Sequence, residues 1–371
     1  MKFTFDREKM LAAFQPAASV APSRSPKPIL QCVKMIGTEN DAILMATDTE
    51  VGIRVSVEGV SIEVPGNIVL PVDLFGNILR ESSDDQLTVV VDGAEIKVTG
   101  GSSNYSLPSQ NADEFPDVQS VEGDASIQIA AGLFGELVKR TIFATDNESS
   151  RYALGGVLLE TEGNNLIAVG TDGRRLAKMQ GPVEISGDVR LGESSTIVPT
   201  RSMNLIARAL GDPDSVVQII PKDNQLAFKT EAVTLTSRLV EGRFPKWKDV
   251  FPSRTDGSKI ELTAGTVYGR LRQASIVAND ESRGITFTFS DGTLAMDATA
   301  AERGQSHTEM PIAYAGKEVG VSLDHRYVEH FLRVLDSEAS FTFDLEGSQA
   351  AVLLSTDDGY SYVIMPLARD R

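Results

Sequence analysis

The sequence contains one cysteine and three histidines, residue types that often act as a nucleophile, a base or a zinc ligand. Cys32 is far along the chain from His307, His325 and His330. Nucleophilic catalysis needs a base and a third, orienting group nearby. A zinc-binding pair of histidines on one helix face is spaced i, i+4, whereas His325 and His330 are five apart. The run Gly170–Gly173 is too short for a phosphate-binding loop and lacks its lysine. The pattern favours a protein that is not an enzyme and uses no metal or cofactor.

Charge is the second chemical feature of the sequence. Its 35 lysines and arginines are outnumbered by 52 aspartates and glutamates, which gives a formal net charge of −17. Domains that bind nucleic acid usually present a basic surface, and an acidic protein repels polyanions at long range. A function on DNA therefore requires the positive charge to be concentrated locally.

Three of the six helices predicted from apolar periodicity carry a net positive charge. Their basic residues are Lys139 and Arg140, Arg201 and Arg208, and Arg270 and Arg272. The last helix is predicted to present Arg326, His330 and Arg333 on the face opposite Tyr327, Phe331 and Leu335. Because lysine and arginine also solvate the outer face of any amphipathic helix, these patterns fit an ordinary solvated surface as well as an anion-binding one.

The compartment follows from the chain ends and the cysteine count. The first ten residues are charged and lack the apolar core of a secretion signal. No apolar run reaches the roughly 18–20 residues that span a bilayer. A single cysteine cannot form an internal disulfide, which fits a reducing compartment. We therefore expect a cytoplasmic protein with no membrane partner.

The elements that position the charged residues occur in three similar units. Three landmarks recur with a period near 125 residues: Asp48, Asp172 and Thr299 after a strand; Pro71, Pro199 and Leu323 before a helix; and Phe115–Pro116, Phe244–Pro245 and Met365–Pro366 near the unit ends. Since the landmarks are independent, their agreement indicates an internal repeat.

Each unit has the same order of elements. A helix opens it, as Met10 and Phe14 at i, i+4 indicate in the first unit. Strands with hairpin signals follow, such as the Asp291–Gly292 turn, and then a second helix and a further hairpin. The fold class predicted is α+β, with three tandem domains of two helices and antiparallel sheets each, at 1–122, 123–252 and 253–371.

The middle unit contains the most specific motifs. Arg151-Tyr152-Ala153-Leu154-Gly155-Gly156 is followed by Thr171-Asp172-Gly173-Arg174-Arg175-Leu176-Ala177. Further on stand Glu241-Gly242-Arg243-Phe244-Pro245 and the terminal Tyr362-Val363-Ile364-Met365-Pro366-Leu367. These segments resemble the bacterial DNA sliding clamps, the β subunits of DNA polymerase III, whose middle domain carries R-Y-x-L-x-G and then T-D-G-H-R-L-A. The similarity covers the whole chain, including all three repeats.

The resemblance implies the DNA-clamp architecture and a processivity function in DNA replication. Two subunits would join head to tail as a homodimer, in a closed ring of six domains whose helices line the hole. Residues at the family's dimer contact would be Ile78, Tyr105 and Leu107 against Ile276 and Val277. Each of these could equally be an ordinary core residue.

The resemblance also implies an encircled partner, double-stranded DNA, bound without sequence preference. Phosphate contacts give salt-sensitive affinity, and a ring can keep each contact weak enough to slide. The residues expected to contact DNA are Arg24, Arg80, Lys139, Arg140, Tyr152, Arg201, Arg208, Arg270 and Arg272.

A second implied site would capture short linear motifs between the second and third units. Its expected partners are the catalytic subunit of DNA polymerase III, the clamp loader, other polymerases and repair proteins. Its lining would be Leu154, Thr171, Gly173, Arg175, Leu176, Pro245, Val250, Tyr327, Val363, Ile364, Met365, Pro366 and Leu367. Methionine and valine make such a surface adaptable.

Some positions depart from the family pattern. Arg174 replaces the usual histidine, Ser282 stands where an aromatic residue is common, and Asp249 and Asp73 occupy positions that are often basic. The tail Ala368–Arg371 is longer than usual. These changes affect the expected peptide preference. A tandem-repeat scaffold that binds peptides without encircling DNA is the alternative, and its function would survive loss of the helix arginines.

Overall fold

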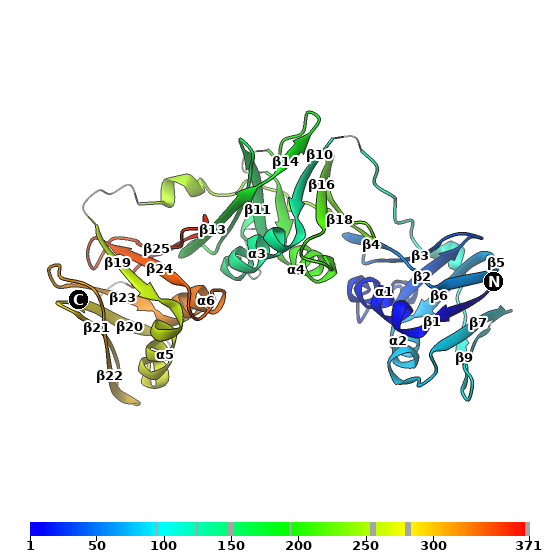
Figure 1. The fold of residues 1–371 in the computed structure, drawn as a ribbon, viewed down its shortest axis with the longest axis horizontal. Helices are drawn as coiled ribbons and strands as arrows, with labels where there is room; N and C mark the ends of the chain where they lie inside the picture. Colours follow the sequence, from blue (N-terminus) through cyan, green and yellow to red (C-terminus); the bar gives the residue numbers. More distant parts are fainter. Residues whose placement is uncertain are drawn as a thin grey trace. The chain divides into compact units, whose positions relative to one another are not determined.

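A computed structural model describes residues 1–93, 95–123, 125–146, 148, 152–192, 195–252, 257–278 and 283–367 (Figure 1). Its internal contacts divide the chain into two compact units, which differ from the three sequence repeats. The amino-terminal unit contains Met1–Gly135, Val183–Val189 and Arg201–Leu239; the carboxy-terminal unit contains Glu136–Pro182, Arg190–Thr200 and Val240–Arg371. This division cuts through the middle repeat, so the domain limits expected from the sequence stay a prediction.

The amino-terminal unit contains two antiparallel sheets. The five-stranded sheet has the order β5–β1–β7–β8–β9, with bounds Val60–Val64, Lys2–Asp6, Gln86–Asp92, Glu95–Thr99 and Asn104–Pro108. The nine-stranded sheet has the order β14–β10–β16–β17–β18–β4–β3–β2–β6, with bounds Glu184–Ser186, Ser126–Ala130, Val216–Lys222, Gln225–Lys229, Val233–Arg238, Val51–Ser56, Ala42–Thr47, Cys32–Gly37 and Gly66–Pro71. The pair β4–β18 joins the first repeat to the second.

The carboxy-terminal unit repeats this plan with a long and a short sheet. The eight-stranded sheet has the order β15–β11–β12–β13–β26–β25–β24–β19, with bounds Ile197–Pro199, Gly156–Glu162, Asn165–Thr171, Arg175–Pro182, Ser361–Ile364, Val352–Ser355, Ser340–Leu345 and Ser258–Thr263. The four-stranded sheet has the order β22–β21–β20–β23, with bounds Gly304–Pro311, Thr293–Ala300, Gly284–Ser290 and Val319–Asp324. Here β13–β26 joins the second repeat to the third.

The described residues form six α-helices, two in each repeat, as the sequence predicts. They are α1 (Arg7–Val20), α2 (Val72–Glu81), α3 (Ala131–Thr141), α4 (Thr200–Ala209), α5 (Ala264–Ala274) and α6 (His325–Arg333). Short 3-10 turns are η1 (Pro28–Gln31), η2 (Ala112–Glu114), η3 (Ile142–Ala144), η4 (Tyr152–Gly155), η5 (Trp247–Val250) and η6 (Ser275–Val277).

Helix α1 shows why these segments are helical and where they pack. The carboxylate of Asp6 caps it by accepting a hydrogen bond from the backbone N–H of Lys9 at 2.9 Å. Met10 and Phe14 are buried, as predicted, because α1 packs against α2 and against strands of both sheets (Figure 1). In the carboxy-terminal unit, α5 likewise packs against α6 and against strands of both sheets.

Helix α6 matches the prediction in part. Its buried residues are Val328, Phe331 and Leu332. Since successive residues turn by about 100°, Arg326, His330 and Arg333 lie on the opposite face, as predicted, although His330 is only partly exposed. Of the predicted apolar set, Phe331 is buried and Tyr327 is partly exposed, whereas Leu335 lies beyond the end of the helix.

Strand register corrects two of the repeat landmarks. Ser237 lies opposite Val51 in β18–β4, and Ile364 lies opposite Arg175 in β26–β13. Met365–Pro366 therefore follows its strand at once, whereas Phe244–Pro245 comes seven residues after Ser237. That third landmark was wrong for the last repeat.

The first landmark is one residue out of register in the last repeat. Gly170 of β12 lies against the carbonyl of Thr141 at the end of α3. In the last repeat, Ser306 donates to the carbonyl of Ala274 at the end of α5, and the cross-strand partner of Ser306 is Ala298. Ala298 thus corresponds to Gly170, and Thr299 corresponds to the threonine that precedes the aspartate.

No helix among the described residues is both long and apolar enough to cross a membrane.

Gly170 generates a test of the α3–β12 packing. A Cβ at Gly170 would collide with the carbonyl oxygen of Thr141, whereas one at Gly347 meets no atom within 4 Å. We expect Gly170→Ala to lower the free energy of unfolding by about 1–3 kcal/mol, and Gly347→Ala to change it by less than about 1 kcal/mol. Urea unfolding of both variants measures this; equal losses would contradict the close packing.

Candidate nucleic-acid interface and peptide pocket

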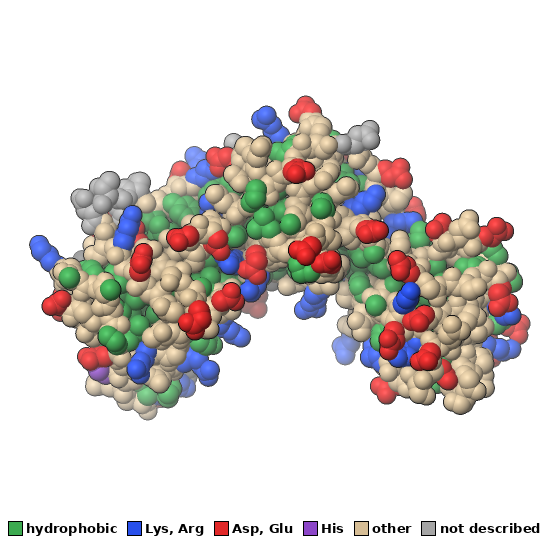
Figure 2. Space-filling model, in the orientation of Figure 1, with side chains coloured by type: hydrophobic (Ala, Val, Ile, Leu, Met, Phe, Trp, Pro, Cys, Tyr) green, Lys and Arg blue, Asp and Glu red, His purple; other side chains and the backbone are tan. Residues whose placement is uncertain are grey.

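Most of the predicted DNA-contacting cations are exposed. Arg24, Arg80, Lys139, Arg208, Arg270 and Arg272 all reach solvent. Two of them donate to neutral amide side chains: Arg80 to Asn77 at 2.5 Å and Arg270 to Gln273 at 3.0 Å. Figure 2 shows acidic and basic side chains interspersed over the face in view, without a continuous surface of either sign. On this face the positive charge is therefore carried by separate side chains.

Lys139 and Arg140 both form ion pairs with nearby acidic side chains. Lys139 pairs with Glu136 at 3.2 Å but keeps 49% of its side chain exposed. Arg140 is only 13% exposed and pairs with Glu136 at 2.9 Å and Asp358 at 2.5 Å. Its guanidinium also lies 5.3 Å above the ring of Tyr360. Arg140 thus stabilises its own unit, and the structure does not leave it free as the sequence suggested.

Arg201 is also engaged. It forms an ion pair with Asp48 and donates a hydrogen bond to the backbone carbonyl of Val20 at 3.1 Å. Asp48 and Val20 belong to the first repeat and Arg201 to the second. Arg201 therefore ties two repeats together within the amino-terminal unit. For Tyr152, the backbone lies in η4 and the side chain lies outside the described residues.

The turn that holds Asp48 is stabilised by its own side chains. The Thr47 hydroxyl donates to the carbonyl of Val51 at 2.7 Å and accepts from the N–H of Thr49 at 3.0 Å. One oxygen of Asp48 accepts from the N–H groups of Glu50 and Val51 at 3.0 and 2.7 Å. Such side-chain bonds to nearby backbone are typical of Thr and Asp in turns.

The middle repeat builds the same turn. The Thr171 hydroxyl donates to the carbonyl of Arg175 at 2.6 Å and accepts from Gly173 at 3.1 Å, and Asp172 accepts from the N–H groups of Arg174 and Arg175. Gly173 has φ +86°, matching φ +83° at Thr49 of the first repeat. The motif recognised in the sequence is thus a structural turn, which places Arg175 at the start of β13.

Arg175 lies at the centre of the candidate pocket and is almost fully buried. Its guanidinium donates to Asp172 at 3.0 Å and to the carbonyl of Phe143 at 2.6 Å, and lies 4.5 Å from the ring centroid of Tyr327. Nη1 lies 2.5 Å from Nδ1 of His330. Because a guanidinium offers only donors, Nδ1 accepts, so His330 is neutral with its proton on Nε2.

An aromatic stack continues from Arg175 across the repeat junction. Phe143 contacts His330 and Tyr362 at centroid distances of 5.7 and 5.6 Å. Phe331 then stacks on Tyr362 and on Tyr360 at 5.7 and 5.2 Å. Sequence reasoning missed the contacts of Phe143 and His330, since neither follows a periodic pattern; the alternation of Tyr360 and Tyr362 was the one available signal.

The predicted pocket residues divide into a buried floor and an exposed rim. The buried members are Leu154, Thr171, Arg175, Leu176, Val363 and Ile364. Gly173 and Pro245 are exposed, and Tyr327, Pro366 and Leu367 are partly so. Val250 and Met365 expose 39% and 47% of their surface. All of these residues lie in the carboxy-terminal unit.

Backbone hydrogen bonds hold the rim in place. The N–H of Met365 donates to the carbonyl of Arg174 at 2.9 Å, and that of Leu367 donates to Ser322 at 2.9 Å. On the other side, Trp247 donates from Nε1 to buried Glu160 at 3.2 Å and packs edge-on against Phe251 at 5.9 Å. The apolar surface is thus carried by segments that backbone hydrogen bonds and packing hold in place.

Two departures from the family pattern, Arg174 and Asp249, lie in the segments that carry this surface. Arg174 and Asp249 are exposed, and Asp249 belongs to η5 beside Val250. Asp73 is exposed in the first turn of α2. Arg151, Ser282 and the tail Ala368–Arg371 lie outside the described residues.

The candidate dimer residues differ in exposure. Ile78 and Leu107 are buried in the single chain, and Tyr105 and Val277 are half-buried. Ile276 exposes 73% of its surface and borders a cavity of about 390 Å³ along α5, with Tyr268 and Arg272. Since single exposed apolar residues are common on protein surfaces, the dimer contact stays a prediction.

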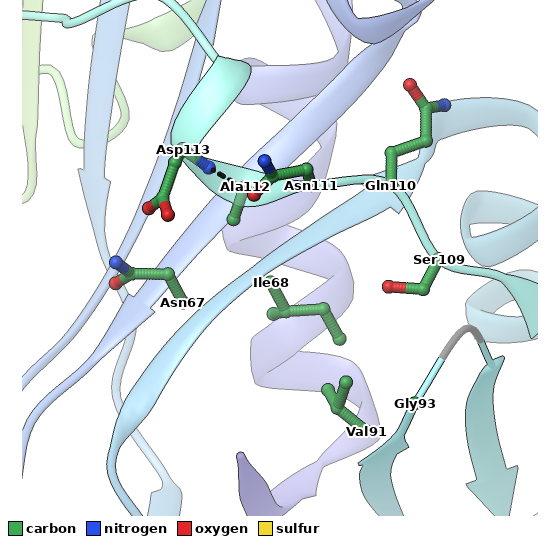
Figure 3. Close-up of a pocket in the computed structure, with 9 residues that line it drawn as sticks. All are labelled: Asn67, Ile68, Val91, Gly93, Ser109, Gln110, Asn111, Ala112 and Asp113. Carbon is green, nitrogen blue, oxygen red and sulfur yellow. Dashed lines mark hydrogen bonds between the residues drawn. The ribbon is translucent and has the colours of Figure 1, made fainter.

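Another cavity, of about 500 Å³, lies in the amino-terminal unit (Figure 3). Its lining runs from Asn67 and Ile68 of β6 to the Ser109–Asp113 segment, where Asn111 accepts from the N–H of Asp113 at 3.1 Å. It contains no residue of the predicted sites. A cavity search alone would therefore point away from the sequence motifs.

The residues first considered for catalysis have structural surroundings. Cys32 is buried, and burial raises the pKa of its thiol to about 11. His307 lies between Asp297 at 2.7 Å and Glu309 at 2.9 Å, and the hydrogen bonds to these carboxylates raise its pKa. Burial, and then the charge of Arg175, lower the pKa of His330.

His330 generates a pH prediction. Because its pKa is lowered in the folded chain, the unfolded chain binds more protons below about pH 6.5. Stability contributed by neutral His330 is therefore present above about pH 6.5 and lost as the pH falls through the lowered folded value. We expect His330→Asn, whose oxygen can still accept from Arg175, to flatten the loss of thermal stability between pH 7.5 and 5.5.

His307→Asn is the matched control, with the opposite sign. The raised pKa of His307 gives stability below about pH 6.5 that is lost as the pH rises through the folded value. Removing it steepens the acid loss. A His330→Asn profile that parallels the native one would contradict the neutral His330.

Comparisons with known proteins cover the whole chain. Models of the DNA polymerase III beta subunit match residues 1–119 (N-terminal domain), 128–246 (central domain) and 248–368 (C-terminal domain). The beta sliding clamps of Pseudomonas putida and Pseudomonas aeruginosa are 30% and 31% identical, each over 99% of this chain and 100% of the relative.

Solved structures agree. A sliding clamp (DNA polymerase III subunit beta) from Pseudomonas aeruginosa bound to griselimycin has a TM-score of 0.92 at 29% identity, over 99% of both chains. The DNA polymerase sliding clamp from Bacillus subtilis has a TM-score of 0.92 at 23% identity, over 100% of both chains, and supports the fold alone. The chain therefore belongs to the family of bacterial beta sliding clamps, the beta subunits of DNA polymerase III, with three tandem α+β domains.

Proposed function

We propose that two copies of this chain close into a ring around duplex DNA and tether replication proteins to it in the bacterial cytoplasm, without catalysing a reaction. The observation that carries the proposal is the repeated junction between domains. In each unit, a strand that follows the Thr–Asp turn pairs with the last strand of the next repeat: β4 with β18, and β13 with β26.

Under the same pairing rule, two of the described strands lack a partner within the chain. In the third repeat the strand after the corresponding turn is β22, an edge of its sheet; in the first repeat the last strand is β9, also an edge. No described strand pairs with the outer side of either. Unpaired edges recruit further strands, so β22 of one copy can pair with β9 of another. Two copies are the smallest assembly that satisfies both edges and closes.

The exposed helix cations support DNA as the encircled ligand. Arg208, Arg270 and Arg272 lie on α4 and α5 and pair with no acid among the described residues. A few such contacts give sequence-independent affinity, while the acidic strands and loops keep the rest of the protein off DNA. Holding by topology lets each contact stay weak.

The apolar rim supports capture of peptide motifs. Met365 and Val250 are exposed beside a buried floor that contains Leu176 and Val363. An extended peptide with two or three apolar side chains could bury this surface, which fits the polymerase catalytic subunit, the clamp loader and repair proteins as partners. One shared pocket would make these partners compete.

We expect the native chain to have a molar mass near twice 39.9 kDa by light scattering, and, once loaded, to stay on circular DNA and leave after linearisation. The triple variant Arg208→Ala, Arg270→Ala, Arg272→Ala should keep the dimer mass but dissociate faster from circular DNA. The salt slope of binding should become shallower by about 0.9 for each arginine that no longer neutralises a phosphate.

The matched control removes three exposed lysines outside the helices: Lys222→Ala, Lys259→Ala and Lys317→Ala. Equal effects of the two triple variants would show that only net charge matters. Retention on linear DNA equal to that on circular DNA would contradict encirclement and favour a peptide-binding scaffold.

For the pocket, we expect Met365→Asp to weaken binding of peptides from the DNA polymerase III catalytic subunit of the same organism by about tenfold, since an apolar surface that the bound peptide would cover is replaced by a charge. Val216→Asp, at an equally exposed valine of the other unit, is the control. Fluorescence anisotropy measures both; unchanged affinity for Met365→Asp would move the site elsewhere.

A further inference from the structure

The two junctions inside the chain, β4–β18 and β13–β26, show which contacts form where two repeats join. In the first, the second residue of α4, Arg201, forms an ion pair with the turn residue Asp48, whose side chain is only 11% exposed. After the paired strands, the N–H of Arg238 donates to the carbonyl of Glu50 at 3.0 Å. An ion pair and a closing backbone hydrogen bond thus complete this junction.

The second junction keeps the closing backbone hydrogen bond but not the ion pair between repeats. Asp172 stands at the corresponding turn position, but its carboxylate is bound by Arg175 of the same turn at 3.0 Å. The second residue of α6 is again an arginine, Arg326, which pairs with Asp324 at 2.6 Å. The closing backbone hydrogen bond runs from Met365 to Arg174 at 2.9 Å.

Strand pairing identifies the corresponding residues at the two free edges. Because Ala298 corresponds to Gly170, Ala300 takes the place of Asp172 and Asp48. The second residue of α2 is Asp73, in the place of Arg201. The hairpin partners Ile96–Leu107, Leu226–Ser237 and Val352–Ile364 are equivalent and buried, so Pro108, which follows Leu107, takes the place of Arg238 and Met365.

Each of these three residues lacks a group that the internal junctions use or carry. The side chain of Ala300 cannot accept a hydrogen bond from an arginine, and Asp73 is negative where α4 and α6 carry an arginine. Pro108 has no backbone N–H to donate. We propose, resting on the two-copy ring, that the seam between copies lacks the ion pair of the first internal junction and the closing hydrogen bond of both, so that the ring is weakest at Asp73, Ala300 and Pro108.

A role inside one chain does not account for these residues. An acid in the first turn stabilises a helix through its dipole, but α4 and α6 fold with arginine at this position. A proline in an edge strand discourages aggregation, yet it does not explain the coordinated change at Asp73 and Ala300. A weak seam accounts for all three.

The test restores the missing pair. We expect Asp73→Arg combined with Ala300→Asp to lower the dissociation constant of the dimer about 30-fold beyond the combined effects of the single variants, because the two-copy ring has two seams and each gains an ion pair at the upper range for solvent-accessible pairs. High salt should reduce the gain. Sedimentation equilibrium over a dilution series measures all four proteins. A gain in affinity cannot arise from misfolding.

The control pair is Glu81→Arg with Ala313→Asp, which makes similar charge changes at exposed positions away from the expected seam. A native dimer whose affinity is unchanged by the restored pair, or is raised equally by the control, would overturn the weak seam and leave the ring intact. A native chain that is monomeric at every concentration would overturn the ring itself, and the seam with it.

Discussion

Unpaired strand edges are the constraint on which the rest of this molecule depends. A repeat of this kind ends in one strand on each side whose backbone groups lack partners, and buried or half-buried backbone groups must be paired. Pairing β4 with β18 and β13 with β26 extends two short sheets into sheets of nine and eight strands. The helices are carried by these sheets, so the positions of the cations follow from edge pairing.

Side chains then fix each pairing. In the carboxy-terminal unit Arg175 satisfies its donors with Asp172, His330 and the carbonyl of Phe143. A buried charge is tolerated only when it is paired and hydrogen-bonded, so the residue holds its neighbours in one arrangement. The rim formed by Met365 lies directly beside this network, because its backbone is bonded to Arg174. Domain joining and the candidate peptide pocket thus use the same residues.

The net charge of −17 and a function on DNA are compatible because affinity and retention are separated. A protein that binds DNA only by contacts needs many phosphate partners. A ring needs few, and an acidic surface elsewhere limits binding outside the hole. Arg140 and Arg201 differ from the exposed cations, since Arg140 pairs with Asp358 within its unit and Arg201 joins two repeats through Asp48.

The sequence by itself determined the repeat, the six helices and the family, because apolar periodicity and turn residues are local signals that recur in each unit. Only the tertiary structure decided which cations are free, that His330 contacts Arg175, and that Ala300 corresponds to Asp48. These depend on pairs far apart in the chain, such as Arg201 with Asp48. Such pairs arise from strand register and packing, which local patterns do not encode.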